Sequence, residues 1–80
     1  MHYVYLLRSV QHPNEFYVGQ SENLKGRLAA HNDGQSIYTQ RHKPWNLVWY
    51  SAFQTREAAL RFEKYLKSGS GKTFLRRHFI

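Results

Sequence analysis

The chain has 80 residues with a formal net charge of +7, 16% of its residues are aromatic, and it contains no cysteine. The length predicts one domain, residues 1–80, and the absence of cysteine excludes disulfides and thiolate metal sites, which suits a reducing, cytoplasmic setting. The positive charge predicts a polyanionic partner, nucleic acid first, over a basic protein without one, and no apolar run is long enough for a membrane span.

Two strands are predicted near the N-terminus, at Tyr3–Leu7 and Tyr17–Gly19, because both runs are rich in aromatic and β-branched residues. The segment between them contains a Pro-Asn pair, which is typical of a turn and indicates a hairpin. Alternation along the strands allows Tyr17 to lie close to Tyr5 across the pair. Gly19 allows a backbone or a ligand to approach closely. The two tyrosine side chains either pack together as ordinary residues of the sheet or line a functional site.

A helix is predicted at Glu22–Asn32, because Ser21 can cap it and Glu22 lies at its positive end. Arg27 and His31 are four residues apart and therefore share one face of this helix. The polar segment that follows, residues 35–44, is expected to be an exposed loop.

This loop mixes aromatic and cationic side chains, among them Tyr38, Arg41 and Lys43. Such a mixture suits contacts with phosphates and unstacked bases. A solvated connector is an equally good interpretation.

A third strand is predicted at Trp45–Phe53, with alternating residues that leave both faces covered. Thr55 then caps a second helix, from Arg56 to about Lys67. Three residues at helical spacing form its buried stripe: Ala59, Phe62 and Leu66.

Glu63 lies beside this apolar stripe, where a carboxylate needs a partner or a metal. Its position alone favours an ion pair with Lys67, four residues further on.

The run Ser68–Gly71 is expected to break this helix, and a short last helix follows from Lys72 to about His78. The glycine-rich run is a flexible connector or, less commonly, a phosphate-binding turn. The C-terminal part is strongly basic through Lys67, Lys72, Arg76, Arg77 and His78.

Several kinds of site are excluded by the sequence. There is no HExxH zinc motif, no Walker loop and no GxGxxG. A two-metal phosphodiesterase site needs several converging acids, whereas the five acids of this chain are scattered along it: Glu15, Glu22, Asp33, Glu57 and Glu63. A single ion held by one carboxylate and waters remains compatible with the sequence, as is common for Mg²⁺.

The ordered motifs resemble a known family. Tyr3-Val4-Tyr5 is followed by Tyr17-Val18-Gly19, then by Arg27 and His31 on one predicted helix and Glu63 on another. This set covers nearly the whole chain and resembles the GIY-YIG nuclease superfamily, most of all its small stand-alone URI-domain or UvrC-like members. The resemblance implies an α+β fold, with a three-stranded antiparallel sheet flanked by about three helices.

The resemblance also implies site residues. The catalytic set would be Tyr5, Tyr17, Arg27, His31 and Glu63, with Glu63 holding a single Mg²⁺ or Mn²⁺ ion. Either tyrosine, or His31, could take the proton from the attacking water. Further residues are expected to contact nucleic acid, and these are Gly19, Gln20, Arg41, Lys43, Lys67, Lys72, Arg76 and Arg77.

Four differences from the family pattern are visible. Tyr3-Val4 replaces the usual Gly-Ile and Val18 replaces isoleucine, Gln20 stands where some members have lysine, and no asparagine follows Glu63. Because 80 residues leave no room for an added DNA-reading domain, weak or structure-directed specificity is expected.

The expected function is therefore a metal-dependent DNA endonuclease that acts on branched, nicked or flapped DNA, as in DNA repair. RNA is an alternative substrate, and a protein partner could supply targeting. The competing interpretation is a nucleic-acid-binding module that keeps the fold without catalysis, and a membrane ligand is not expected.

Overall fold

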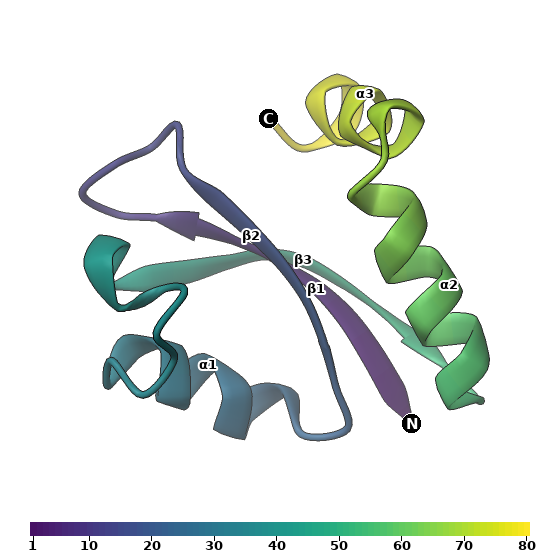
Figure 1. Ribbon diagram of the computed structural model, residues 1–80, viewed down its shortest axis with the longest axis horizontal. Coiled ribbons are helices and arrows are strands. Elements are labelled where there is room, and N and C mark those ends of the chain that lie inside the picture. The colour runs from purple at the N-terminus through teal and green to yellow at the C-terminus, as the bar shows by residue number, and fades with distance from the viewer.

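The computed structural model describes all residues, 1–80, as one antiparallel sheet with helices on both faces (Figure 1). The elements are β1 (His2–Ser9), β2 (Phe16–Ser21), α1 (Leu24–Asn32), a short 3-10 helix (Gln40–His42), β3 (Trp45–Phe53), α2 (Arg56–Leu66) and α3 (Gly69–His78). The strand order is β2-β1-β3, with both pairs antiparallel. This arrangement confirms the α+β fold with a three-stranded antiparallel sheet and three α-helices. None of the helices is both long and apolar enough to cross a membrane.

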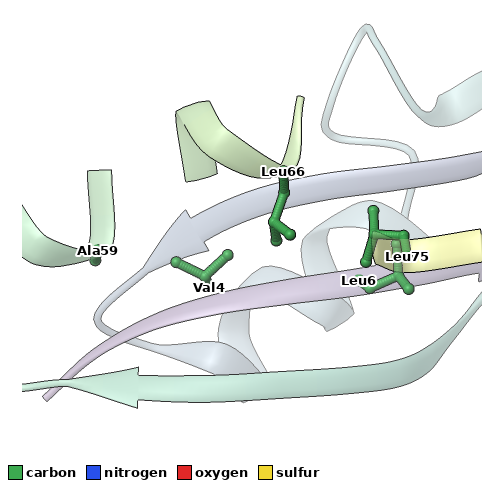
Figure 2. Close-up of a cluster of buried hydrophobic side chains, with 5 residues drawn as sticks. All are labelled: Val4, Leu6, Ala59, Leu66 and Leu75. Atoms are coloured by element: carbon green, nitrogen blue, oxygen red, sulfur yellow. The ribbon is translucent and has the colours of Figure 1, made fainter. Parts of the chain in front are cut away.

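The central strand β1 is buried on both faces, because its middle is an uninterrupted apolar and aromatic run. Val4 and Leu6 point to one face, where they pack with Leu66 of α2 and Leu75 of α3 (Figure 2). We call this the α2 face. Tyr5 and its neighbours on the opposite face pack towards α1, and we call this the α1 face.

The hairpin of β1 and β2 brings Tyr5 and Tyr17 close together, as expected. Tyr5 lies opposite Gly19, and Leu7 lies opposite Tyr17. The two tyrosines are therefore diagonal neighbours on the α1 face, with their ring centres 6.3 Å apart. The ring of Tyr5 covers the glycine, and Tyr17 stands beside it.

β3 contains a bulge that interrupts the expected alternation, and the expectation that both its faces are covered is wrong, since Val48, Tyr50 and Ala52 are exposed. Leu6 pairs with Trp49, but the next residue of β1, Leu7, pairs with Leu47. The extra residue places Leu47 on the α1 face, whereas Trp49 lies on the α2 face. There Trp49 stacks on Phe79, with ring centres 4.7 Å apart.

α1 begins later than expected, at Leu24 rather than at Glu22, and its cap is not Ser21. Ser21 is the last residue of β2, so its backbone is committed to the sheet. Asn23 caps the helix instead, because its Oδ1 accepts a hydrogen bond from the Gly26 N–H at 3.0 Å.

α2 begins as expected. Thr55 Oγ1 accepts a hydrogen bond from the Ala58 N–H at 3.2 Å, and the helix ends at Leu66. The predicted stripe is confirmed, since Ala59 and Leu66 are buried and Phe62 packs against the same cluster.

α3 begins at Gly69, so the expectation of a non-helical Ser68–Gly71 is wrong. Ser68 caps α3 by accepting a hydrogen bond from the Gly71 N–H at 3.2 Å, which places the glycines in the first helical turn. Gly71 is buried where α3 meets the end of α2. An added Cβ at Gly71 would overlap the carbonyl oxygen of Tyr65. Only glycine allows the two helices to approach this closely.

Candidate active site

Three of the predicted site residues meet on the α1 face. The hydroxyl of Tyr5 lies 3.0 Å from Nε2 of His31, and the ring of Tyr17 lies 4.8 Å from the imidazole, centre to centre. Tyr5 is only 1% exposed and His31 is fully buried, whereas Tyr17 is half-buried. The cluster therefore has an inner phenol and an outer phenol around one imidazole.

Arg27 lies on α1, one turn before His31, and its guanidinium is beside the Tyr5 hydroxyl. Burial raises the pKa of Tyr5, and Arg27 opposes this by favouring the phenolate. The same contact raises the pKa of Arg27. The Arg27 side chain is otherwise exposed, so its remaining donors can reach an anion in solution.

Gly19 allows these rings to come together. A Cβ built on Gly19 would overlap the hydroxyl end of Tyr5 and would lie 2.9 Å from Cε2 of Tyr17. The close approach that the sequence predicted at this glycine is thus made by the protein's own phenols. A ligand is not needed to explain the glycine.

We expect Gly19→Ala to displace Tyr5 or Tyr17 and to lower the free energy of unfolding by about 1–3 kcal/mol, as overpacking does. Denaturant unfolding would measure the loss, and NMR shifts of the tyrosine rings would report the displacement. Gly69→Ala is the control, because an added methyl there meets nothing within 4 Å. Unchanged tyrosine shifts in Gly19→Ala would contradict this account of the packing.

The environment of His31 favours its neutral form. Burial lowers the pKa of His31 below 6.5, and the positive charge of Arg27 lowers it further. Both ring nitrogens nevertheless have partners, since Nδ1 lies 2.6 Å from the hydroxyl oxygen of Thr39.

We expect acid to destabilise the fold through His31. Because the pKa is lower in the folded state, the contribution of His31 is complete above pH 6.5 and is lost as the pH falls through the lowered folded value. Chemical unfolding of the wild type and of His31→Gln between pH 7 and pH 5 measures this. The free energy of unfolding should fall more in the wild type than in the variant over this range. An equal dependence on pH in the two proteins would contradict the lowered pKa of His31.

A hydrogen-bonded anchor behind His31 was not predicted from the sequence. Thr39 is 1% exposed although it lies in a polar loop, and its carbonyl accepts a hydrogen bond from the indole Nε1–H of Trp45 at 2.9 Å. Asn32 donates to the Trp45 carbonyl at 3.2 Å and accepts a hydrogen bond from the Trp45 N–H. The expectation of a wholly exposed loop is therefore wrong at Thr39. A single threonine in a polar run carries no periodicity that would reveal its burial.

Glu63 belongs to a different helix from Arg27 and His31. It lies on α2, half-buried, and its Oε2 accepts a hydrogen bond from Lys67 Nζ at 3.0 Å. The ion pair expected from the spacing is present. The carboxylate also lies close enough to Tyr5 for its negative charge to raise the pKa of that phenol.

The side chains near Glu63 that could act as ligands determine which metal ion would suit this position. No group of three or more histidine, cysteine or acidic side chains is arranged to hold an ion. One hard carboxylate fits an ion such as Mg²⁺, which keeps several waters and takes further oxygens from a phosphate.

A surface groove of about 590 Å³ adjoins Tyr17, between β2 and the helices α2 and α3. Its floor is apolar and includes Leu66 and Leu75, and Glu15 is its one acidic residue. Three of the predicted nucleic-acid-binding cations line it, and these are Lys67, Lys72 and Arg76.

The other predicted nucleic-acid contacts lie away from the lining of this groove. Arg77 is exposed on α3, and Arg41 and Lys43 are exposed in the loop before β3. Gly19 is buried under the tyrosines, and Gln20 is a half-buried residue of β2.

Comparison with known proteins now identifies the fold. The profile of the GIY-YIG catalytic domain matches residues 1–77. The chain belongs to the GIY-YIG family, which is a family of nucleases. Among its GIY-YIG relatives, a UPF0213 protein of Staphylococcus haemolyticus is 34% identical over 86% of this chain and 83% of that protein. A UPF0213 protein of Streptococcus pyogenes is 38% identical over 81% of this chain and 70% of its own length.

A third GIY-YIG relative has a name that describes an activity. It is the structure-specific endonuclease subunit SLX1 of Kluyveromyces lactis, which is 41% identical over 74% of this chain. The matched region makes up 23% of SLX1, so the similarity concerns this domain only.

Proposed function

We propose that this GIY-YIG domain is a metal-dependent endonuclease that hydrolyses phosphodiester bonds in DNA. One observation supports this most directly. Tyr5, Tyr17 and His31 converge beside Arg27, and the charge of Glu63 on α2 lies within electrostatic reach of the same phenol. Two phenols, an imidazole, an exposed guanidinium and one carboxylate are groups that can hold a phosphate and move a proton beside it.

The proposal gives direct roles to the guanidinium, one phenol and the carboxylate. Arg27 binds a phosphate oxygen pair in the forked geometry that suits a guanidinium. One tyrosine, in the phenolate form that the Arg27 guanidinium favours, accepts the proton of the attacking water, so that one water O–H bond breaks as the new P–O bond forms. The P–O bond to the leaving oxygen breaks in the same displacement, and solvent protonates that oxygen.

Glu63 would hold Mg²⁺ or Mn²⁺, and the bound ion would supply positive charge to the phosphate and the leaving oxygen. The protein's own part is to keep that carboxylate half-buried and, through Lys67, oriented before the ion arrives.

The surface supports DNA with unpaired or branched segments as the substrate. Lys67, Lys72 and Arg76 line the groove beside Tyr17, where a phosphate backbone would be attracted. Tyr38 is 80% exposed in the loop that also carries cations, and an exposed aromatic ring can stack on an unstacked base. The relative SLX1 is named as a structure-specific endonuclease subunit, which supports both this preference and a partner that directs cleavage.

The test uses purified protein, Mg²⁺ or Mn²⁺, and linear, nicked, flapped and branched DNA of one sequence. We expect cleavage of the flapped or branched forms, reduced about 100-fold or more in Arg27→Ala because a phosphate-binding donor is lost. Arg56→Ala, at an exposed position on α2, is the control and should cleave normally. Equal cleavage by Arg27→Ala would mean that a contaminant is responsible. Salt-sensitive binding without any cleavage would instead favour a non-catalytic binding module.

A further inference from the structure

The groove beside Tyr17 has a cationic rim above an apolar floor. Its three cations outnumber its one acid, Glu15, so the groove attracts a polyanion. Two of the cations, Lys72 and Arg76, are four residues apart and therefore lie on the same face of α3. We propose that this groove holds an unpaired DNA strand, with its phosphates at the rim and its bases on the floor. That this strand belongs to a substrate rests on the function proposed above.

The floor of the groove requires an occupant that has apolar surface of its own. Part of the floor faces solvent, since Phe16 and Val18 are half-buried and Ile80 is 49% exposed. Covering such surface is favourable in proportion to the apolar area removed from water. Phosphates cannot cover it, because they are charged and hydrated. The faces of unstacked bases can, as they do in proteins that bind single strands.

The size of the groove keeps a duplex away from the floor. The groove has a volume of about 590 Å³, whereas a DNA duplex is comparable in width to the whole domain, whose shortest extent is 17 Å. A duplex can touch the rim with the phosphates on its outside, but its bases remain stacked within it. An unpaired strand presents phosphates and bases to the same surface. The combination of rim and floor therefore favours the unpaired strand.

The groove is continuous with the candidate site. Tyr17 is part of its lining, and the ring of Tyr17 lies 4.8 Å from that of His31, centre to centre. Lys67 is also part of the lining, and its Nζ donates a hydrogen bond to Glu63 at 3.0 Å. A strand in the groove therefore lies next to groups that are proposed to act on a phosphate. This continuity favours DNA over an acidic segment of a protein, which would match the charge of the rim equally well.

Binding without metal tests this proposal separately from cleavage. Fluorescence anisotropy at one fixed salt concentration compares a single-stranded oligonucleotide with the blunt duplex of the same sequence. A surface that only attracts phosphates would prefer the duplex, because its charge density is higher. We expect the wild type to bind the single strand about tenfold more tightly instead, since contacts to bases add to contacts to phosphates.

Ile80→Ser removes apolar surface from the groove without changing any charge. We expect it to weaken single-strand binding about threefold and to leave duplex binding unchanged. Val10→Ser is the control, because Val10 is also 49% exposed but lies outside the groove. An Ile80→Ser protein with wild-type affinity for the single strand would overturn the proposal, and an acidic protein segment would then be the better occupant.

Arg76→Gln and Arg77→Gln separate the groove from the general charge of α3. Both variants remove one positive charge from an exposed position, but only Arg76 lines the groove. We expect Arg76→Gln to reduce the preference for the single strand about threefold and Arg77→Gln to leave that preference unchanged. Equal effects of the two variants on the preference would contradict the proposal.

The failure of this proposal and the failure of the proposed function can be told apart. If the wild type cleaves flapped DNA but binds the duplex more tightly than the single strand, the proposal for the groove alone is wrong. If the wild type binds as expected but cleaves no DNA, the proposed function is wrong, and the groove is still a site for single strands.

Discussion

Glu63→Gln is expected to lower the cleavage rate about a thousandfold, which corresponds to the several kcal/mol of charge stabilisation that a bound ion can supply. The amide has the size of the carboxylate but not its charge, so it is a poor ligand for Mg²⁺. Because Glu63 is half-buried and its hydrogen-bond partner is the exposed Lys67, the fold should survive the change. Single-turnover cleavage in excess Mg²⁺ measures the effect.

A second consequence of Glu63→Gln needs no cleavage. Burial is the main cause of the raised pKa of Tyr5, and the negative charge of Glu63 adds a smaller contribution in the same direction, so its removal should lower that pKa slightly. Titration of the Tyr5 ring by NMR would detect the change. Glu57→Gln, in the first turn of the same helix, is the control for both measurements. If Glu63→Gln cleaves within about tenfold of wild type, the carboxylate is not the metal ligand, and the proposal of a single ion held there fails.

Gly71→Ala is expected to have the largest effect on stability. The added methyl would overlap the carbonyl oxygen of Tyr65 and would lie 2.5 Å from Cα of Leu66, both of which are backbone atoms that cannot rotate away. α3 must then move off α2, which opens the core where Leu66 and Leu75 meet (Figure 2). We expect a loss of about 3 kcal/mol or more. That is a large part of the roughly 4–12 kcal/mol that holds a domain of this length together.

Gly69→Ala provides a matched control on the same helix. Its Cβ would meet nothing within 4 Å, so alanine should be neutral or should stabilise the helix by up to about 1 kcal/mol. Urea unfolding followed by circular dichroism compares the two variants. Equal midpoints for Gly71→Ala and Gly69→Ala would show that the helices do not pack as closely as described.

Much of the fold could be predicted because short-range patterns determined it. The hydrophobic run of β1, the Thr55 cap and the stripe along α2 are local features, and the structure confirms them. The errors lie where tertiary contacts override local preference. Ser21 is a residue type that caps helices well, but its backbone pairs with β1 as the end of β2. Gly69 and Gly71 belong to α3, and the close packing of α3 on α2 requires a glycine at position 71.

The features of the candidate site also divide into those that the sequence predicted and those that depend on tertiary contacts. The order of Tyr5, Tyr17, Arg27, His31 and Glu63 in the sequence was enough to suggest a family, which the comparison then showed. The sequence predicted the ion pair of Glu63 with Lys67, but it could not show that this carboxylate also lies within electrostatic reach of Tyr5. It gave no indication of Thr39 either, because a hydrogen bond between residues 31 and 39 depends on where a loop returns.

By itself the sequence determined the strands, the basic charge and the set of residues able to handle a phosphate. Only the tertiary structure decided which phenol is buried, which side chain holds the imidazole and why Gly19 and Gly71 cannot carry a side chain. The physical reason is that periodicity and composition act over a few neighbouring residues. Burial, pKa and hydrogen-bond partners are instead set by groups that chain folding brings together from distant positions.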